Sequence, residues 1–272
     1  MNRFYVITNV EKDKNLETTR QICNYLRARG CECTVREFQK EKETGENGDY
    51  RYTDASLIPA GTECILVLGG DGTLIQAARD TVDRKIPLLG VNLGTLGFLA
   101  EIEKAGVPDA LDSLILDNYT IEPRMLLEGT VYREGREPVK NLALNDIVVN
   151  RAGALRIIDY EISVNGEPLN RYSADGMIVS TMASMIVVTP ICPHTLTARS
   201  IVLSGGDRVT VRTGAGRRNQ REESFVTFDG EVQVPVATGD YVEIKKSEKT
   251  VNILKISRVS FLEVLRDKMR GN

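Results

Sequence analysis

The stretch from Cys64 to Val82 constrains the fold more than any other part of the sequence. The continuous apolar run Cys64–Leu68 is typical of a strand buried on both faces. Gly69-Gly70-Asp71-Gly72-Thr73 follows directly, and Thr73–Val82 has the pattern of a helix. Glycines let the backbone approach a ligand closely, and a helix amino terminus offers free N–H groups to phosphate oxygens. The stretch therefore predicts either a phosphate-binding loop or a tight turn in which the aspartate is a local cap.

The first part of the chain alternates strand and helix patterns around this stretch. Besides Cys64–Leu68 and Thr73–Val82, the predicted strands are Phe4–Thr8, Cys33–Phe38 and Pro87–Asn92, and the predicted helices are Leu16–Arg29 and Val107–Asp117. This alternation predicts a parallel sheet covered by helices. Residues 39–60 have no convincing period, and we expect a surface loop there.

A second glycine-bearing turn supports the phosphate-binding interpretation. Gly94-Thr95-Leu96-Gly97 follows the Pro87–Asn92 strand directly. Both glycine loops should then lie along the carboxyl edge of the sheet, where ligands bind in open α/β folds. We therefore favour a binding site over a structural turn.

After about residue 120 the pattern changes to short strands separated by turn residues. The predicted strands are Arg124–Tyr132, Leu142–Asn150, Arg156–Val164, Gly176–Thr181, Met185–Thr189, Asp207–Thr213, Ser224–Phe228, Tyr241–Lys245 and Val251–Ile256. Such a series predicts a β-sandwich-like, all-β second domain. We expect an α/β domain at 1–118 and a β-rich domain at 119–256. The helical segment Phe261–Met269, within 257–272, should bury its apolar face on the first domain.

Charge and cysteine content narrow the classes of partner. The net charge of −3 gives no strong basic field to hold nucleic acid or an anionic membrane surface. The amino terminus lacks the apolar region of a signal peptide, and no run is long enough for a transmembrane helix. The five cysteines are odd in number and include no Cys-x-x-Cys pair, so we expect reduced thiols and a cytoplasmic protein.

Several catalytic motifs are absent from the sequence. There is no G-x-x-x-x-G-K-[ST] P-loop, no G-x-G-x-x-G dinucleotide fingerprint and no G-x-S-x-G elbow. The only histidine, His194, cannot build a multi-histidine metal site, and we expect it to make a structural hydrogen bond. We therefore predict that no side chains of the protein form a metal site.

These residues resemble the NAD kinase family. The Gly69–Thr73 motif is shared with diacylglycerol and sphingosine kinases and with phosphofructokinases, so four further stretches carry the match. They are Gly90–Leu99, Leu144-Asn145-Asp146, Asp175–Thr181 and Thr189–Leu196, in the family's order and across both predicted domains.

The resemblance implies a role for each matching residue. Asp71 would accept the proton of the adenosine 2′-hydroxyl of NAD as it attacks the γ-phosphate of ATP, with Mg²⁺ or another divalent cation on the donor phosphates. The implied dinucleotide-binding residues are Gly72, Leu96 and Phe98 around the adenosine, the pair Asn145 and Asp146, and Asp175 toward a neighbouring subunit. Family members are homodimers or homotetramers. The alternatives of ATP or polyphosphate as donor, and of NAD or NADH as acceptor, stay open.

The sequence departs from the family pattern after Ser180-Thr181. The family continues there with a Pro-Thr-Gly-Ser-Thr-Ala-Tyr-like segment, whereas here Met182-Ala183-Ser184 leads straight into Met185–Val188. The missing stretch carries family contacts to the dinucleotide. An engineered or sequencing deletion, a catalytically impaired NAD- or NADP-binding homologue, and a variant that closes its site otherwise are all compatible with this gap. Lipid kinase activity is a weaker alternative, because neither end of the chain has an interfacial helix.

Overall fold

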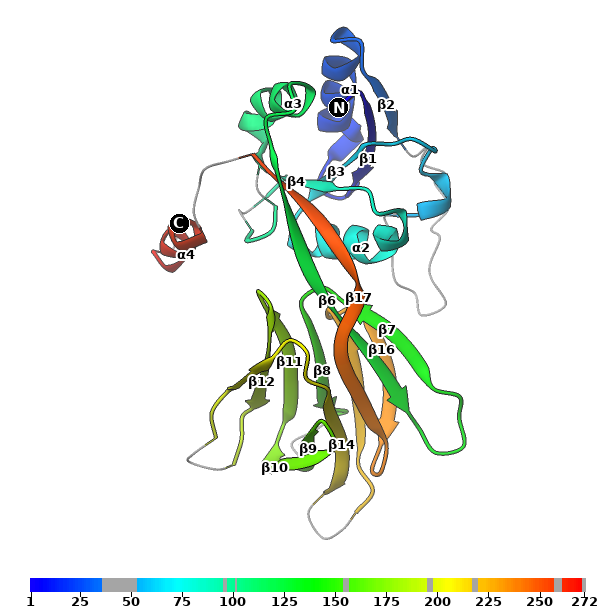
Figure 1. Ribbon diagram of the computed structural model, residues 1–272, viewed down its shortest axis with the longest axis vertical. Helices are drawn as coiled ribbons and strands as arrows, with labels where there is room; N and C mark the ends of the chain where they lie inside the picture. Colours follow the sequence, from blue (N-terminus) through cyan, green and yellow to red (C-terminus); the bar gives the residue numbers. More distant parts are fainter. Residues whose placement is uncertain are drawn as a thin grey trace. The chain divides into compact units, whose positions relative to one another are not determined.

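The computed structural model describes residues 1–35, 53–94, 97–100, 102–153, 157–194, 198–216, 220–256 and 261–270. It divides the chain into two compact units (Figure 1). The first unit is Met1–Arg124 with Val251–Asn272, and the second is Met125–Thr250. Among the helices of the described ranges, none combines the length and apolar character needed to cross a lipid bilayer.

The first unit is built on a parallel sheet with helices on both sides. Its strands follow the order β17-β4-β3-β1-β2, with β5 added beside β4. The strands are β1 (Arg3–Thr8), β2 (Glu32–Val35), β3 (Cys64–Gly69), β4 (Leu88–Asn92), β5 (Ile102–Glu103) and the end of β17 (Tyr241–Lys255). The helices are α1 (Glu17–Ala28), α2 (Asp71–Thr81), α3 (Val107–Ile115) and α4 (Phe261–Met269).

Alternation along the buried strands assigns the helices to opposite faces of this sheet. Leu89 and Val91 of β4 belong to one core cluster with residues of α1 and α3. Gly90 lies between them and faces the other way, where a Cβ atom would lie 2.9 Å from a methyl carbon of Leu74 in α2. Thus α1 and α3 cover one face and α2 covers the other, which explains why β3 is apolar throughout.

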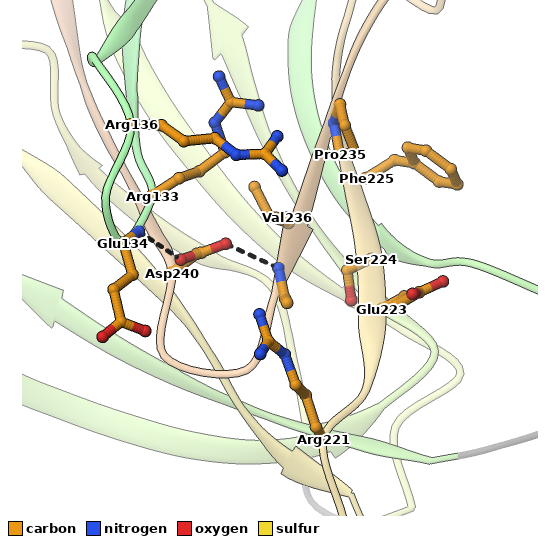
Figure 2. A pocket seen from close by; sticks show the side chains of 11 residues that line it. Arg133, Glu134, Arg136, Arg221, Glu223, Ser224, Phe225, Pro235, Val236 and Asp240 are labelled. Carbon is orange, nitrogen blue, oxygen red and sulfur yellow. Dashed lines mark hydrogen bonds between the residues drawn. The ribbon is translucent and has the colours of Figure 1, made fainter.

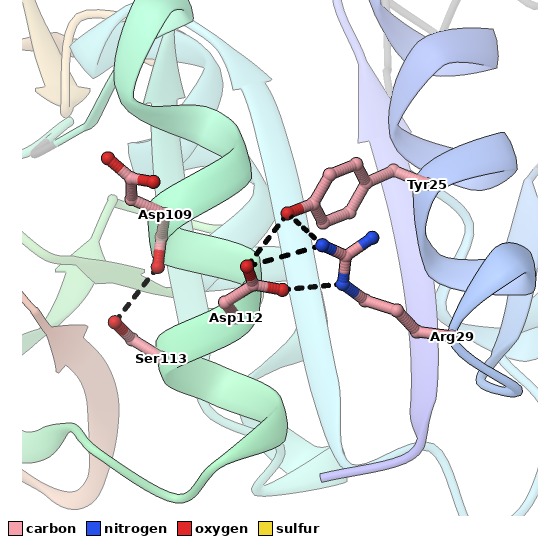
Figure 3. Close-up of polar contacts among 5 residues, drawn as sticks. All are labelled: Tyr25, Arg29, Asp109, Asp112 and Ser113. Atoms are coloured by element: carbon pink, nitrogen blue, oxygen red, sulfur yellow. Dashed lines mark hydrogen bonds and ion pairs between the residues drawn. The ribbon is translucent and has the colours of Figure 1, made fainter.

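A polar cluster joins α1 to α3 at the edge of this core (Figure 3). Arg29 donates from Nε to Asp112 Oδ1 at 2.6 Å, and Tyr25 Oη donates to Asp112 Oδ2 at 2.9 Å. The Arg29 guanidinium also lies 3.5 Å from the centre of the Tyr25 ring. The hydrogen bonds from Arg29, and then from Tyr25, lower the pKa of Asp112. The cluster is exposed, so the packed core beneath it contributes most of the stability.

The second unit is a two-sheet β-structure with a single apolar core cluster. One sheet has the order β13-β12-β11-β8-β15-β16. The other contains β10-β9-β14 and the first part of β17, with β6 and β7 alongside. The strands are β6 (Thr120–Tyr132), β7 (Val139–Ala143), β8 (Asp146–Arg151), β9 (Ile158–Val164), β10 (Glu167–Ala174), β11 (Gly176–Met182), β12 (Met185–Ile191), β13 (Ile201–Ser204), β14 (Val209–Gly216), β15 (Glu223–Phe228) and β16 (Val232–Ala237).

The fold class predicted from the sequence is confirmed, and several elements differ from their predicted bounds. Helix α2 begins at Asp71, two residues before the predicted Thr73, so the aspartate lies in the first helical turn. The predicted strand Leu142–Asn150 is two strands, β7 and β8. The predicted strands Tyr241–Lys245 and Val251–Ile256 are the single strand β17. Strands β5, β10, β13 and β16 were not predicted, and most of the predicted 39–60 loop lies outside the described residues.

Two further expectations have mixed outcomes. The structure joins Cys23 of α1 to Cys33 of β2 in a disulfide, which contradicts the prediction of reduced thiols throughout, while Cys31, Cys64 and Cys192 are free. A Cα–Cα separation of 5.4 Å allows this bridge. Helix α4 has the predicted bounds, but Leu262 and Met269 are 66% and 79% exposed, so burial of its apolar face stays a prediction.

Candidate active site

The first glycine loop and the start of the second, at Leu93 and Gly94, lie side by side at the carboxyl edge of the first unit's sheet. Strands β3 and β4 are parallel neighbours, with Gly69 opposite Asn92 in register. The Leu93 N–H donates to the Gly69 carbonyl at 2.8 Å, which ties the second loop to the first. Asn92 is buried, and its side chain both accepts from and donates to the Gly94 backbone. The start of the second loop, at Leu93 and Gly94, is therefore tied to the end of β3 and to Asn92.

Asp71 is held by three backbone hydrogen bonds at this edge. Its Oδ2 accepts the Phe98 N–H at 2.7 Å, and its Oδ1 accepts the N–H groups of Leu99 and Ala100, each at 3.1 Å. An ionised carboxylate has about four lone-pair sites, so three are used and about one remains for a further donor. The carboxylate is thus held in one place while keeping the capacity to accept a proton.

Glycine is required at position 97 for this arrangement. A Cβ atom on Gly97 would overlap the carboxyl group of Asp71. The segment after the second glycine loop can therefore wrap around the carboxylate only because this residue has no side chain. Gly97 lies in the family-like stretch Gly90–Leu99, but its contact with Asp71 was not predicted.

The remaining predicted residues of the first unit have different environments. Gly72 is exposed in the first turn of α2, and a Cβ atom there would meet nothing within 4 Å. Phe98, whose backbone N–H binds the Asp71 carboxylate, is 41% exposed. Leu96 lies outside the described residues. Asp71, Gly72 and the Phe98 backbone therefore lie close together, and their roles in binding stay a prediction.

Asn145 and Asp146 form a second cluster, in the second unit. The carboxylate of Asp229 accepts the N–H groups of Leu144 at 2.8 Å, Asn145 at 2.7 Å and Asp146 at 3.2 Å. These N–H groups are directed to a side chain instead of a neighbouring strand, which is why the predicted strand is broken here. The Asn145 side chain is exposed beyond the turn.

Asp229 was not among the predicted site residues, and its negative charge adds to the effect of burial in this cluster. Burial, and then the negative charge of Asp229, raise the pKa of Asp146. Asp229 itself has a left-handed backbone (φ 50°) and precedes Gly230. An Asp-Gly pair directly after a strand is the signal that would have identified it.

Asp175 lies away from Asn145 and Asp146. Strand β11 is antiparallel to β8 with Gly176 opposite Asn150, so Asp175 is beside Arg151 at the other end of β8. The Arg151 guanidinium donates to Asp175 Oδ2 at 3.3 Å. At about 3.4 Å per residue, the length of β8 separates this pair from Asp146 by about 17 Å.

His194 and a surface cavity are two further polar features of the second unit. The His194 backbone N–H donates to Ser173 O at 2.8 Å, and the imidazole is exposed. A cavity of about 370 Å³ is lined by Arg133, Glu134, Arg136, Arg221, Glu223, Ser224, Phe225, Pro235, Val236, Ala237 and Asp240 (Figure 2). Its three arginines are balanced by three carboxylates, and none of the predicted site residues that the structure describes lines it.

Comparison with known protein families and structures gives consistent matches over the whole chain. Residues 4–119 match the ATP-NAD kinase N-terminal domain, and residues 182–256 match the ATP-NAD kinase C-terminal domain. An NAD kinase of Lachnospira eligens is 44% identical, with 99% of this chain and 100% of the relative covered. One from Lachnoclostridium phytofermentans is 41% identical, with 98% and 99% covered.

Two solved structures share the fold. Yeast NADH kinase complexed with NADH superposes with a TM-score of 0.82 at 19% identity, covering all of this chain and 88% of the other. An NAD kinase from Archaeoglobus fulgidus in complex with ATP gives 0.72 at 20% identity, with 99% of each chain covered.

Proposed function

The chain belongs to the NAD kinase family, and from that premise we propose that it phosphorylates NAD at the adenosine 2′-hydroxyl, with ATP as the donor. The observation that carries this proposal is the Asp71 carboxylate, held by three backbone N–H groups where two glycine loops meet a helix amino terminus. The related proteins solved with NADH and with ATP support nucleotides as the ligands.

In the proposed reaction, Asp71 accepts a proton from the attacking hydroxyl. The 2′-oxygen forms a bond to the γ-phosphorus of ATP, the bond from that phosphorus to the bridging β–γ oxygen breaks, and ADP leaves. The hydroxyl proton moves to the carboxylate at the lone-pair site left open by its three donors. Phosphoryl transfer has a loose transition state, so positioning and charge neutralisation supply most of the catalysis. The rigid hold on Asp71 provides the positioning.

The other predicted residues would bind the dinucleotide. Gly72, Phe98 and Leu96 would line the adenosine site, and Asn145 with Asp146 would grip the acceptor nucleotide. The separation of Asp175 from Asp146 along β8 supports a contact with nucleotide bound mainly by a neighbouring subunit. We therefore include a homodimer or homotetramer in the proposal. We also include a cytoplasmic location, which the sequence predicts.

A divalent cation, preferably Mg²⁺, would be bound at this site by the donor phosphates. Within the described residues no group of three or more His, Cys, Asp or Glu side chains is placed to hold a metal. Mg²⁺ is commonly bound by substrate phosphates with one or two carboxylates. When bound, it would neutralise charge on the phosphates, and the chain's own residues would orient the acceptor.

A second function deserves a test because of the β11–β12 junction. Met182 pairs with Met185, so Ala183 and Ser184 alone close the hairpin where the family has a longer segment. The alignment with the Lachnospira relative spans 296 residues although this chain has 272, which supports a gap. A catalytically impaired NAD- or NADP-binding homologue, or an engineered deletion variant, is therefore the alternative.

A coupled assay of NADP formation with ATP and Mg²⁺ tests both functions. We expect turnover in the wild type and a loss of at least a hundredfold in Asp71→Asn, since general base catalysis contributes about 10²–10⁴. The exposed Asp109 provides a matched control, Asp109→Asn, which should keep full activity. Wild-type turnover in Asp71→Asn would remove Asp71 from the mechanism, whereas NAD binding by calorimetry without any turnover would establish the impaired homologue. Parallel assays with polyphosphate and NADH identify the donor and acceptor.

A further inference from the structure

The surface cavity of the second unit lies between the β6–β7 turn of one sheet and the outer strand β16 of the other (Figure 2). Its volume of about 370 Å³ is sufficient for a small molecule. Two of its arginines, Arg133 and Arg136, belong to the β6–β7 turn, and the third, Arg221, precedes β15. The reaction proposed above uses none of these side chains.

The carboxylate of Asp240 holds two sides of this cavity together. Its Oδ1 accepts the Glu134 N–H at 3.1 Å, and its Oδ2 accepts the Ala237 N–H at 2.8 Å. The Tyr132 ring also stacks on Tyr241, with the ring centres 4.8 Å apart. The β6–β7 turn and the end of β16 are therefore fixed to the same short connection, and the cavity is formed before any ligand enters.

The segment that carries Arg221 is also fixed. The Glu222 N–H donates to Thr238 Oγ1 at 2.9 Å, and the Thr238 N–H donates to the Glu222 carbonyl at 3.1 Å. Thr238 Oγ1 in turn donates to the Gly214 carbonyl at 3.1 Å. Figure 2 shows that Arg221 approaches the cavity from the side opposite the other two arginines.

The arginine side chains of this cavity have no acceptors. Within the described part of the chain, none of the three makes an ion pair or a hydrogen bond, and the Nε atom of Arg133 is buried. The carboxylates equal the arginines in number, but Asp240 is directed to backbone N–H groups. Figure 2 shows the Glu134 and Glu223 carboxylates turned away from the neighbouring Arg133 and Arg136 guanidinium groups. A buried N–H without an acceptor is unfavourable, and like charges repel, so a bound anion would relieve both.

We propose that this cavity binds a small organic anion with a charged group at each end. The guanidinium fork matches the paired oxygens of carboxylate and phosphate groups alike. Arginines on opposite sides suit two such groups, and the apolar Val236 side chain, which Figure 2 shows between them, suits a short carbon chain. The inference does not depend on the proposed kinase function, because the cavity lies within the second unit and none of the described site residues lines it.

The test compares Arg133→Met and Arg221→Gln with the matched control Arg208→Gln. Arg208 is an exposed arginine of the same unit that lies outside the cavity and is ion-paired with Glu243 at 3.5 Å. We measure binding of citrate, fructose 1,6-bisphosphate and acetate by calorimetry at constant ionic strength. Each cavity variant should weaken binding of a multiply charged probe about tenfold to a hundredfold, since charge-assisted hydrogen bonds are lost. The control should stay within about twofold, because exposed ion pairs contribute little.

Arg133→Met also gives a measurement that is separate from affinity. Without added anion, its Tm should equal or exceed that of the wild type, because the substitution removes a buried N–H donor that has no acceptor. With a saturating anion, the Tm of the wild type should rise and that of the variant should not.

The outcomes identify the ligand chemistry or overturn the inference. Binding of citrate alone identifies a carboxylate site, and binding of the bisphosphate alone identifies a phosphate site, provided that both cavity variants lose it. If the wild type binds neither, binds acetate as tightly, or binds no better than Arg133→Met and Arg221→Gln, the cavity is not a site for such anions. A lower Tm of Arg133→Met without anion would make Arg133 a structural residue, and Arg221→Gln alone would then decide.

Discussion

The substitution Gly97→Ala tests the arrangement of the active-site carboxylate directly. The new methyl group would overlap the carboxyl carbon and both oxygens of Asp71, so one of the two groups must move. Asp71 begins α2 and cannot retreat without disturbing that helix, so the side chain or the segment that wraps it must shift. Either movement breaks the hydrogen bonds from the N–H groups of Phe98, Leu99 and Ala100.

The expected loss of stability follows from those three hydrogen bonds. A hydrogen bond to a charged group contributes about 1.5–3 kcal/mol, and water replaces part of that at a half-buried site. We therefore expect a net loss of about 2–3 kcal/mol in the free energy of unfolding, or roughly 5–10 °C in Tm. Displacement of a reacting group by about 1 Å costs about a hundredfold in rate, so kcat should fall by at least that factor.

The assay measures thermal unfolding and NADP formation for Gly97→Ala beside Gly106→Ala. The control introduces the same methyl group in the same unit, where its nearest neighbour would be an Ile102 carbon at 3.7 Å. We expect the control to match the wild type in both measurements. A Gly97→Ala protein with wild-type Tm and kcat would refute the wrapped conformation of Asp71.

Three further outcomes are expected. In the native chain a thiol reagent should label exposed Cys192 first, and Cys192→Ser should abolish this fast phase, because Cys31 and Cys64 are buried and burial raises the pKa of Cys64. The raised pKa of Asp146 means that this carboxyl favours the folded state below its ordinary pKa and loses that contribution as the pH rises through the raised value. Asp146→Asn should therefore melt at the same or a higher temperature at pH 7 while NAD affinity falls, and a clearly lower Tm would contradict the assignment. Sedimentation at micromolar concentration should give a dimer or larger species, and a strict monomer would count against the role proposed for Asp175.

The sequence predicted the central elements of the fold well and its edges poorly. The strands of the first unit's sheet core, such as β3, are apolar throughout because helices cover both faces, and that pattern is unmistakable. Three of the strands not predicted, β10, β13 and β16, are the outer strands of their sheets. Outer strands are exposed along much of their length and tolerate residues such as Pro235, whose missing N–H is harmless at an edge. The first five residues of β10 are all exposed, so that strand lacks the alternation by which inner strands are recognised.

The site residues also divide into those that the local sequence predicted and those that it did not. Local sequence was enough to bring Asp71, Gly72 and the second glycine loop to one edge, because consecutive parallel strands end together. The partners of those groups are long-range and have no local pattern: Asp229 reaches Asn145 across 84 residues of sequence, and Asn9 reaches Thr73 across 64. Side-chain capture of backbone N–H groups depends on tertiary packing, which one-dimensional periodicity does not contain.

The junction between β11 and β12 carries the last prediction. The two strands are paired without interruption from Gly176–Ile191 to Met182–Met185, and β11 also pairs with β8 and β12 with β13. Their inward residues, including Met177 and Val188, are buried in the core cluster. The sheet is therefore complete without the family's longer segment. The cost is local: Ala183 has the left-handed φ of 54° that a tight hairpin needs and that glycine or asparagine adopts more readily.

One substitution and one insertion at this junction should therefore have opposite effects on stability and on NAD affinity. Ala183→Gly relieves the left-handed backbone and should raise stability by about 0.5–1 kcal/mol without changing NAD affinity. Inserting a Pro-Thr-Gly-Ser-Thr-Ala-Tyr-type segment between Thr181 and Met185 should leave Tm nearly unchanged, because the flanking strands are already paired and buried. It should tighten NAD binding by one or two orders of magnitude, since a few hydrogen bonds of about 1 kcal/mol each are restored. Calorimetry with NAD and a thermal melt on both variants measure the two effects. If the inserted segment raises Tm strongly and leaves NAD affinity as it was, the segment is structural, and the dinucleotide site assigned around this hairpin is wrong.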